Sequence, residues 1–242
     1  MPHQTSAKTT SAKTLLAAAF GAGLAAAAVC GALPAAADTA HTTDSPFGTS
    51  VRGSGALRTQ PRTVGAFNAI SASGGIDLDL RIGPQAAVTV EADDNLQDLI
   101  RTEVHDGTLV LDSRGSWSSR HDPVVHVTVP AIERLETNGS GQATLNDLAA
   151  DTLKITLSGS GGVSATGKVR QLQLAIEGSG DADLDNLDIR AAAVRIDGSG
   201  NANLSPRDSL DATINGSGDV RYTGLIAHLS TQIHGTGDVV RQ

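Results

Sequence analysis

The chain has few of the residues that usually stabilise a small domain or equip it for chemistry. Its 242 residues include one cysteine, one tryptophan, one tyrosine and three phenylalanines. A single cysteine, Cys30, excludes an intramolecular disulfide framework. Aromatic residues at 2% leave little material for stacking on bases or sugars. The core therefore has to be built from Val, Ile, Leu and Ala.

The N-terminal 37 residues have the pattern of an export signal. They contain a polar start with Lys8 and Lys13, an apolar run over 15–29 and a small-residue end over 32–37. We predict a signal peptide over 1–37 that is removed after Ala37. The apolar run is too short and too rich in Ala for a good membrane span. The alternatives are an uncleaved anchor, or a lipoprotein modified at Cys30, although Val29 stands where a small residue is expected.

Loss of residues 1–37 would leave 16 basic and 26 acidic residues, a net charge of −10, and no cysteine. A negative net charge argues against nucleic acid as a partner, because the phosphates of nucleic acid bind to basic patches. It also argues against electrostatic docking on anionic lipid. We therefore expect an exported protein of the periplasm or the cell surface and medium, with no stable membrane span and no nucleic acid bound.

Gly-Ser-Gly triplets divide the second half of the chain at near-constant spacing. Five copies and a final Gly-Thr-Gly follow one another at intervals of 20, 19, 20, 18 and 19 residues. The triplet glycines, which we predict to be structural corners, are Gly139 and Gly141, Gly159 and Gly161, Gly178 and Gly180, Gly198 and Gly200, Gly216 and Gly218, and Gly235 and Gly237. Such a period indicates a repeat architecture.

Apolar residues alternate with polar ones on both sides of each triplet. Ala182 and Leu184 follow the third triplet with Asp183 between them, and the run 172–176 precedes it. Period-two alternation predicts short strands with one buried face, and no helical pattern intervenes. We therefore predict an all-β fold over 64–242, a parallel β-helix or solenoid whose coils turn at the glycines. Residues 38–63, rich in Thr, Ser, Gly and Pro, are predicted to be a flexible leader.

The segment 64–135 departs from the repeat. Ser73-Gly74-Gly75 looks like a degenerate triplet, while 86–92 and 124–129 read as strands, and 94–100 reads as a short helical turn. Asp106-Gly107 between alternating residues is a hairpin signal. We predict antiparallel strands here that cap or flank the coils, since the terminal units of a solenoid are usually atypical.

Together these segments resemble the head GIN domain family of exported bacterial proteins, whose members are described as heads of autotransporter adhesins. The resemblance covers roughly 64–240 and rests on the repeat and on the stretches 90–96, 104–111 and 127–136. It implies a right-handed parallel β-helix and a location in the envelope. It implies no established activity and no defined site residues. The sequence has no segment resembling the membrane β-barrel of an autotransporter.

Polar residues after the triplets are the main candidates for a site. Asp181, Asp183 and Asp185 alternate along one strand, and Asp219 belongs to a later coil. Clustered carboxylates could bind Ca²⁺ or act as an acid–base pair on a sugar. The plainer interpretation is a solvated polar face. No metal or other cofactor is predicted.

Trp117 and two histidines are further candidates for a site. Trp117 lies between Arg114 and Arg120 in a polar loop, where it could stack on a sugar or a partner, or pack back on the domain edge. His121 and His126 are five residues apart and would face opposite sides of a strand, which disfavours a shared metal.

No nucleophile motif or catalytic triad spacing is recognisable. We therefore expect a non-catalytic envelope protein, a scaffold for adhesion or for binding an envelope protein or surface polysaccharide. The alternatives are a carbohydrate-active β-helix enzyme and a solenoid stabilised by Ca²⁺. The last coil, near 231–239, could also support self-association through its strand edge.

Overall fold

The computed structural model describes residues 42–45 and 48–242, and these residues belong to one compact unit, Ala40–Gln242. The predicted signal peptide lies outside the described residues. Strands make up nearly all of the described chain, and one 3-10 turn is present. No helix in this part of the chain is long and apolar enough to cross a membrane.

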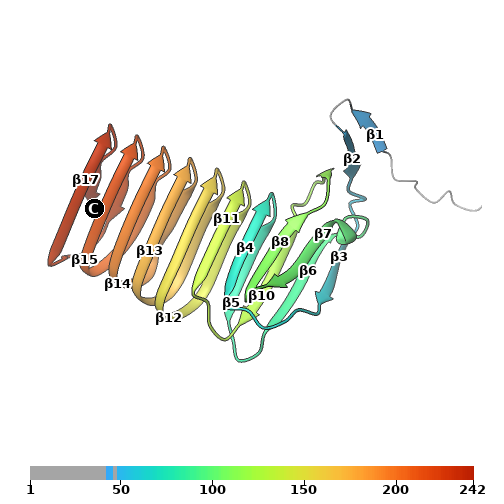
Figure 1. Cartoon of the computed structure of the whole chain (residues 1–242), viewed down its shortest axis with the longest axis horizontal. Helices are drawn as coiled ribbons and strands as arrows, with labels where there is room; N and C mark the ends of the chain where they lie inside the picture. Colours follow the sequence, from blue (N-terminus) through green and yellow to red (C-terminus); the bar gives the residue numbers. More distant parts are fainter. Residues whose placement is uncertain (1–41, 46–47) are drawn as a thin grey trace, which may run out of the picture. The chain divides into compact units, whose positions relative to one another are not determined.

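The repeat region forms a parallel β-solenoid, as predicted. Successive coils lie side by side in Figure 1, from β4 to β17. Its strands are β4 (Ala69–Gly74), β5 (Asp77–Ile82), β11 (Arg134–Gly139), β12 (Gln142–Gly159), β13 (Gly162–Gly178), β14 (Asp181–Gly198), β15 (Ala202–Gly216), β16 (Val220–Tyr222), β17 (His228–Gly235) and β18 (Val239–Arg241). All pairings between neighbouring coils are parallel, from β4–β11 to β15–β17 and β16–β18.

The core consists of columns in which apolar residues of successive coils stack on one another. In one column Leu157 lies beside Ile176, which lies beside Ile196 and then Ile214, and all four are buried. The residues between them along each strand point outward, so the pattern along each strand alternates between buried and exposed. Burial of these aliphatic columns replaces the aromatic core that the composition rules out.

The triplets form the corners, and the stacking is tight. A Cβ added at Gly178 would lie 2.5 Å from the Gly159 carbonyl oxygen of the preceding coil. Backbone hydrogen bonds join the coils there, such as the one from Ser179 N–H to Gly159 O at 2.9 Å. The degenerate triplet is part of the same series, because Gly74 is the register partner of Gly139.

The N-terminal part carries the antiparallel strands that the sequence predicts. Its elements are β1 (Thr42–Ser45), β2 (Gly48–Arg52), β3 (Leu57–Arg62), β6 (Ala87–Asp93), the 3-10 turn η1 (Gln97–Leu99), β7 (Ile100–His105), β8 (Thr108–Ser113), β9 (Ser116–Ser118) and β10 (Val124–Val129). β7 and β8 form a hairpin, and Asp106 and Gly107 in its turn have φ of 49° and 74°. These values match the turn that an Asp-Gly pair favours.

One boundary differs from the sequence-based expectation. β3 and β2 lie within 38–63, the segment we predicted to be a flexible leader. β3 pairs antiparallel with β6 over six residues, and buried Gln97 donates a hydrogen bond from Nε2 to Arg58 O at 2.5 Å. The strand was missed because its side chains alternate poorly and it includes Pro61, which only an edge strand tolerates.

Candidate functional site

The residue that follows each triplet forms a ladder along the corner of the solenoid. Asp181 Oδ1 accepts hydrogen bonds from the backbone N–H and the Nδ2 of Asn201, both at 2.9 Å. Asn201 Oδ1 accepts from the N–H of Asp219 at 3.2 Å, and Asp219 Oδ1 accepts from the N–H of Asp238 at 3.0 Å. Two of the four candidate carboxylates therefore hold the next coil in place.

The other two candidate carboxylates lie further along β14. Asp183 and Asp185 are exposed, and Asp183 Oδ1 lies 3.5 Å from the Asp185 N–H. Partial desolvation, and secondarily the nearby charge of Asp183, raise the pKa of Asp185 above its usual value. The structure brings Asp181 and Asp219 into one column with Asn201 between them, and it leaves Asp183 and Asp185 in other columns.

Among the described residues, no group of three or more His, Cys, Asp or Glu side chains is placed to hold a metal ion. His126 instead places Nδ1 3.1 Å from Asp79 Oδ2, and the other oxygen of Asp79 accepts from Asn146 Nδ2 at 3.0 Å.

Trp117 lies on β9, where it is the register partner of Val51 on β2. It is half-buried and packs against the apolar core, and its ring reaches within 4.0 Å of the position that a Cβ on Gly75 would take. Of the two interpretations offered by the sequence, the structure therefore has the ring packed back on the domain edge.

A charged surface that was not predicted from the sequence lies where the coils bend. The register between neighbouring coils shifts after Leu145, Ser164 and Leu184, so each long strand turns there. Charged residues recur among the outward residues at this bend in successive coils. We call them the bend strip, and its members are Asp151, Lys168, Arg170, Asp188, Arg190, Arg207 and Asp208.

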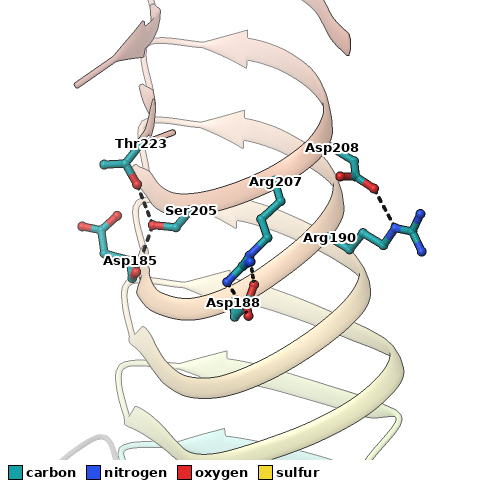
Figure 2. Close-up of polar contacts among 7 residues, drawn as sticks. All are labelled: Asp185, Asp188, Arg190, Ser205, Arg207, Asp208 and Thr223. Atoms are coloured by element: carbon teal, nitrogen blue, oxygen red, sulfur yellow. Dashed lines mark hydrogen bonds and ion pairs between the residues drawn. The ribbon is translucent and has the colours of Figure 1, made fainter. Parts of the chain in front are cut away.

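Ion pairs link the bend strip from coil to coil (Figure 2). Arg190 Nε donates to Asp208 Oδ2 at 2.6 Å, and Arg207 Nη2 donates to Asp188 Oδ2 at 2.7 Å. Arg170 Nη1 donates to Asp151 Oδ1 at 3.1 Å. The arginines expose about two thirds of their side chains, so each pair adds at most about 1 kcal/mol to stability.

The bend strip borders an open depression of about 410 Å³. Ala149, Ala150 and Val169 supply its small apolar lining, and five residues of the strip supply the charged lining. Lys168 is exposed and makes no ion pair within the part of the chain that the structure describes. None of Asp181, Asp183, Asp185 and Asp219 lines this depression.

The signal for this strip is present in the sequence but irregular. Lys168-Val169-Arg170 and Asp188-Ile189-Arg190 show the same alternation of charged, apolar and charged residues, one coil apart. The register shifts at the bend of β14, so the triplet spacing alone does not reveal that Arg207 lies beside Asp188 of the preceding coil.

An all-β parallel solenoid with glycine corners defines the chain as a β-solenoid repeat protein. The chain belongs to the family described as "putative auto-transporter adhesin, head GIN domain", whose model matches residues 66–225. That membership suggests an exported protein. No curated protein sequence matches the chain.

Solved structures confirm the fold. A putative adhesin from Bacteroides fragilis NCTC 9343 is 22% identical, with a TM-score of 0.64 over 80% of this chain and 100% of that chain. A putative adhesin from Parabacteroides distasonis ATCC 8503 is 22% identical, with a TM-score of 0.52 over 79% and 99%. A putative lipid binding protein from the same organism is 21% identical, with a TM-score of 0.53 over 80% and 99%. At these identities the likeness concerns the fold alone.

Proposed function

We propose that the protein is a non-catalytic adhesion scaffold of the cell envelope, and that its bend strip binds an acidic surface polysaccharide. The observation that carries the proposal is Lys168, an exposed ammonium that has no ion pair among the described residues and lies beside the small apolar lining of the depression. The family name, which refers to adhesins, supports the general role.

The charges of the strip suit a carboxylated polymer better than a neutral one. Four cations, Lys168, Arg170, Arg190 and Arg207, face three carboxylates in a protein that is acidic overall. A guanidinium carries five N–H donors, and each of these arginines uses only one or two of them on its aspartate. Within the part of the chain that the structure describes, the remaining donors have no other side-chain acceptor, so they can bind the carboxylates of a ligand.

The geometry of the solenoid suits a chain-like ligand. Equivalent side chains on neighbouring coils lie about 4.8 Å apart, a spacing close to that of successive units in a polysaccharide. The small residues Ala149, Ala150 and Val169 leave room for the apolar face of a sugar ring between the charged side chains. A linear polymer could therefore run across several coils, with one unit beside each coil.

Binding to a uronic acid polymer tests this proposal. We expect polygalacturonate to bind the protein and neutral dextran not to bind. The variant Lys168→Ala/Arg170→Ala should bind polygalacturonate about tenfold more weakly, which corresponds to about 1.4 kcal/mol. The affinity should also fall as salt concentration rises.

A matched variant separates the site from net charge. Arg81→Ala/Arg195→Ala removes two exposed cations elsewhere on the solenoid and changes the net charge equally. We expect this variant to bind like the wild type. Equal losses in both variants, or equal binding of dextran, would contradict a site at the bend strip.

The same samples test the non-catalytic part of the proposal. The length of the polymer should stay unchanged during incubation. If the polymer is shortened, and Asp181→Asn/Asp183→Asn/Asp219→Asn abolishes the shortening, the protein is a carbohydrate-active enzyme and the proposal is wrong.

A further inference from the structure

In the last coil of the described solenoid, one edge of β17 is not covered by any described strand. β17 pairs with β15 on one side, and it has no strand on its other side among the described residues. Figure 1 shows β17 as the final strand of the stack. The N–H of Ala227 donates to the carbonyl of Asp208 on β15 at 3.0 Å. In an extended strand, the backbone groups of successive residues point alternately to its two sides. Since Ala227 points toward β15, the even-numbered residues of β17 direct their N–H and C=O groups at the open edge.

Apolar side chains that would be buried in any other coil are uncovered here. Leu229 and Ile233 continue the core columns of Leu210 and Ile214. The two inner residues are 0% exposed, whereas Leu229 is 48% exposed and Ile233 is 41% exposed. Four of the five large hydrophobic residues that are exposed in the described part of the chain belong to the region 225–240.

The sequence of β17 is self-complementary about Thr231. His228-Leu229-Ser230-Thr231-Gln232-Ile233-His234 reads as the same chemical pattern from either end. In an antiparallel pair centred on Thr231, Leu229 lies opposite Ile233 of the second copy, and His228 lies opposite His234 of the second copy. Leu229, Thr231 and Ile233 stay on the core side, and the other residues of the segment stay on the outer side.

We propose that two copies of the chain associate end to end through β17, with the strands antiparallel and Thr231 of each copy opposite Thr231 of the other. The arrangement is an isologous two-fold dimer. It pairs the free backbone groups of both edges and joins the two aliphatic cores. This assembly is independent of the bend strip and of any polysaccharide.

The other end of the stack explains why the second copy attaches here and does not extend a filament. The edge strand β7 carries Arg101 and Glu103, and the edge strand β3 carries Arg58 and Pro61. Charged residues and proline on an edge strand oppose pairing with another chain. Between His228 and Gly235, β17 has no Asp, Glu, Lys, Arg or Pro. The two C-terminal ends are therefore the compatible pair, and the assembly stops at two copies.

A disulfide across the two-fold axis tests the register. We expect the full chain carrying Cys30→Ser and Thr231→Cys to form a disulfide-linked dimer in air, seen on a non-reducing gel and lost on reduction. Residues directly opposite in such a pair lie within disulfide range, about 4.5 to 5.5 Å between Cα atoms. The matched control, Gln232→Cys in the same Cys30→Ser background, lies diagonally from its copy and on the outer face, and it should stay unlinked.

The oligomeric state of the unlinked chain provides the second readout. We expect the full-length wild type to sediment as a dimer, and Leu229→Lys/Ile233→Lys to sediment as a monomer with an unchanged β-sheet circular dichroism spectrum. A monomeric wild type at the highest soluble concentration would overturn the proposal. So would larger oligomers that grow with concentration, or equal cross-linking of the Thr231→Cys and Gln232→Cys chains.

Discussion

At the first position of each triplet, glycine is needed for two separate reasons. Gly178 has a φ of 130°, which L side chains rarely adopt, and its missing Cβ leaves room for the Gly159 carbonyl of the preceding coil. Gly180 has no such φ, but a Cβ there would lie 2.4 Å from Gly161 O. The second glycine is therefore required only because the neighbouring backbone leaves no room for a Cβ. The sequence pattern, which shows glycine at both positions, does not distinguish this reason from a positive φ.

We predict that Gly178→Ala destabilises the fold by about 2 to 4 kcal/mol, from backbone strain and from the displacement of the neighbouring coil. Urea unfolding followed by circular dichroism measures this loss. Ser179→Ala is the matched control, since Ser179 is exposed at the same corner and contributes its backbone N–H to the coil contact. A Gly178→Ala protein as stable as Ser179→Ala would show that the corner tolerates a side chain.

Hydroxyl groups at the middle of the triplets contribute less than their repetition suggests. Only Thr236 and Ser217 make a hydroxyl-to-hydroxyl bond among the described triplets, at 3.0 Å. The coils are joined there by backbone N–H groups, such as Ser199 N–H to Gly178 O at 2.8 Å. The serine is then selected mainly because a small polar side chain suits an exposed corner.

Each long strand is divided by its bend, and the bend of β14 contains a carboxyl group with a raised pKa. Asp185 lies where the register to β15 shifts, and its backbone carbonyl accepts a hydrogen bond from Ser205 Oγ at 2.9 Å. Figure 2 shows the carbonyl contact together with the hydroxyl pair of Ser205 and Thr223. Desolvation first, and Asp183 second, raise the pKa of the Asp185 carboxyl.

Because the pKa of Asp185 is raised in the folded chain, the contribution of this residue to stability depends on pH. Between the ordinary Asp pKa and the raised value, the folded chain binds more protons than the unfolded chain, so this residue's contribution to stability falls as pH rises. We predict that Asp185→Asn stabilises the protein at neutral pH and that the gain disappears below the ordinary Asp pKa. Urea unfolding at both pH values measures it, with exposed Asp211→Asn as the control. A gain of equal size at both pH values would contradict the electrostatic cause.

The elements follow from the sequence to different degrees. The coils, their aliphatic columns and the Asp106-Gly107 hairpin could be predicted, because period-two alternation and glycine spacing are local signals. β3 could not, since its pairing with β6 is non-local and its own residues do not alternate. The bend strip was missed for a related reason. Which outward residues of different coils lie side by side depends on the register shifts at the bend, and the triplet spacing does not reveal those shifts.

Across the whole molecule, the residues that stabilise the repeat differ from the residues that we propose to bind a ligand. The corners, the Asp181–Asn201–Asp219 ladder and the aliphatic columns hold successive coils together, so these residues are occupied by structural contacts. The bend strip adds little stability and faces solvent. Asp181 and Asp219, two of the four aspartates that stood out in the sequence, therefore belong to the scaffold. The surface proposed for binding lies on a different part of each coil.

The two lysines of the described chain provide an internal test of this account. Lys168 belongs to the bend strip, and Lys154 lies exposed on the strand portion that leads to the next corner. Labelling of the amines by reductive methylation, read by mass spectrometry with and without polygalacturonate, compares the two sites in one molecule. We predict that the bound polymer protects Lys168 and leaves Lys154 as reactive as before. Equal protection of both lysines, or protection of Lys154 alone, would contradict the assignment of binding to the bend strip.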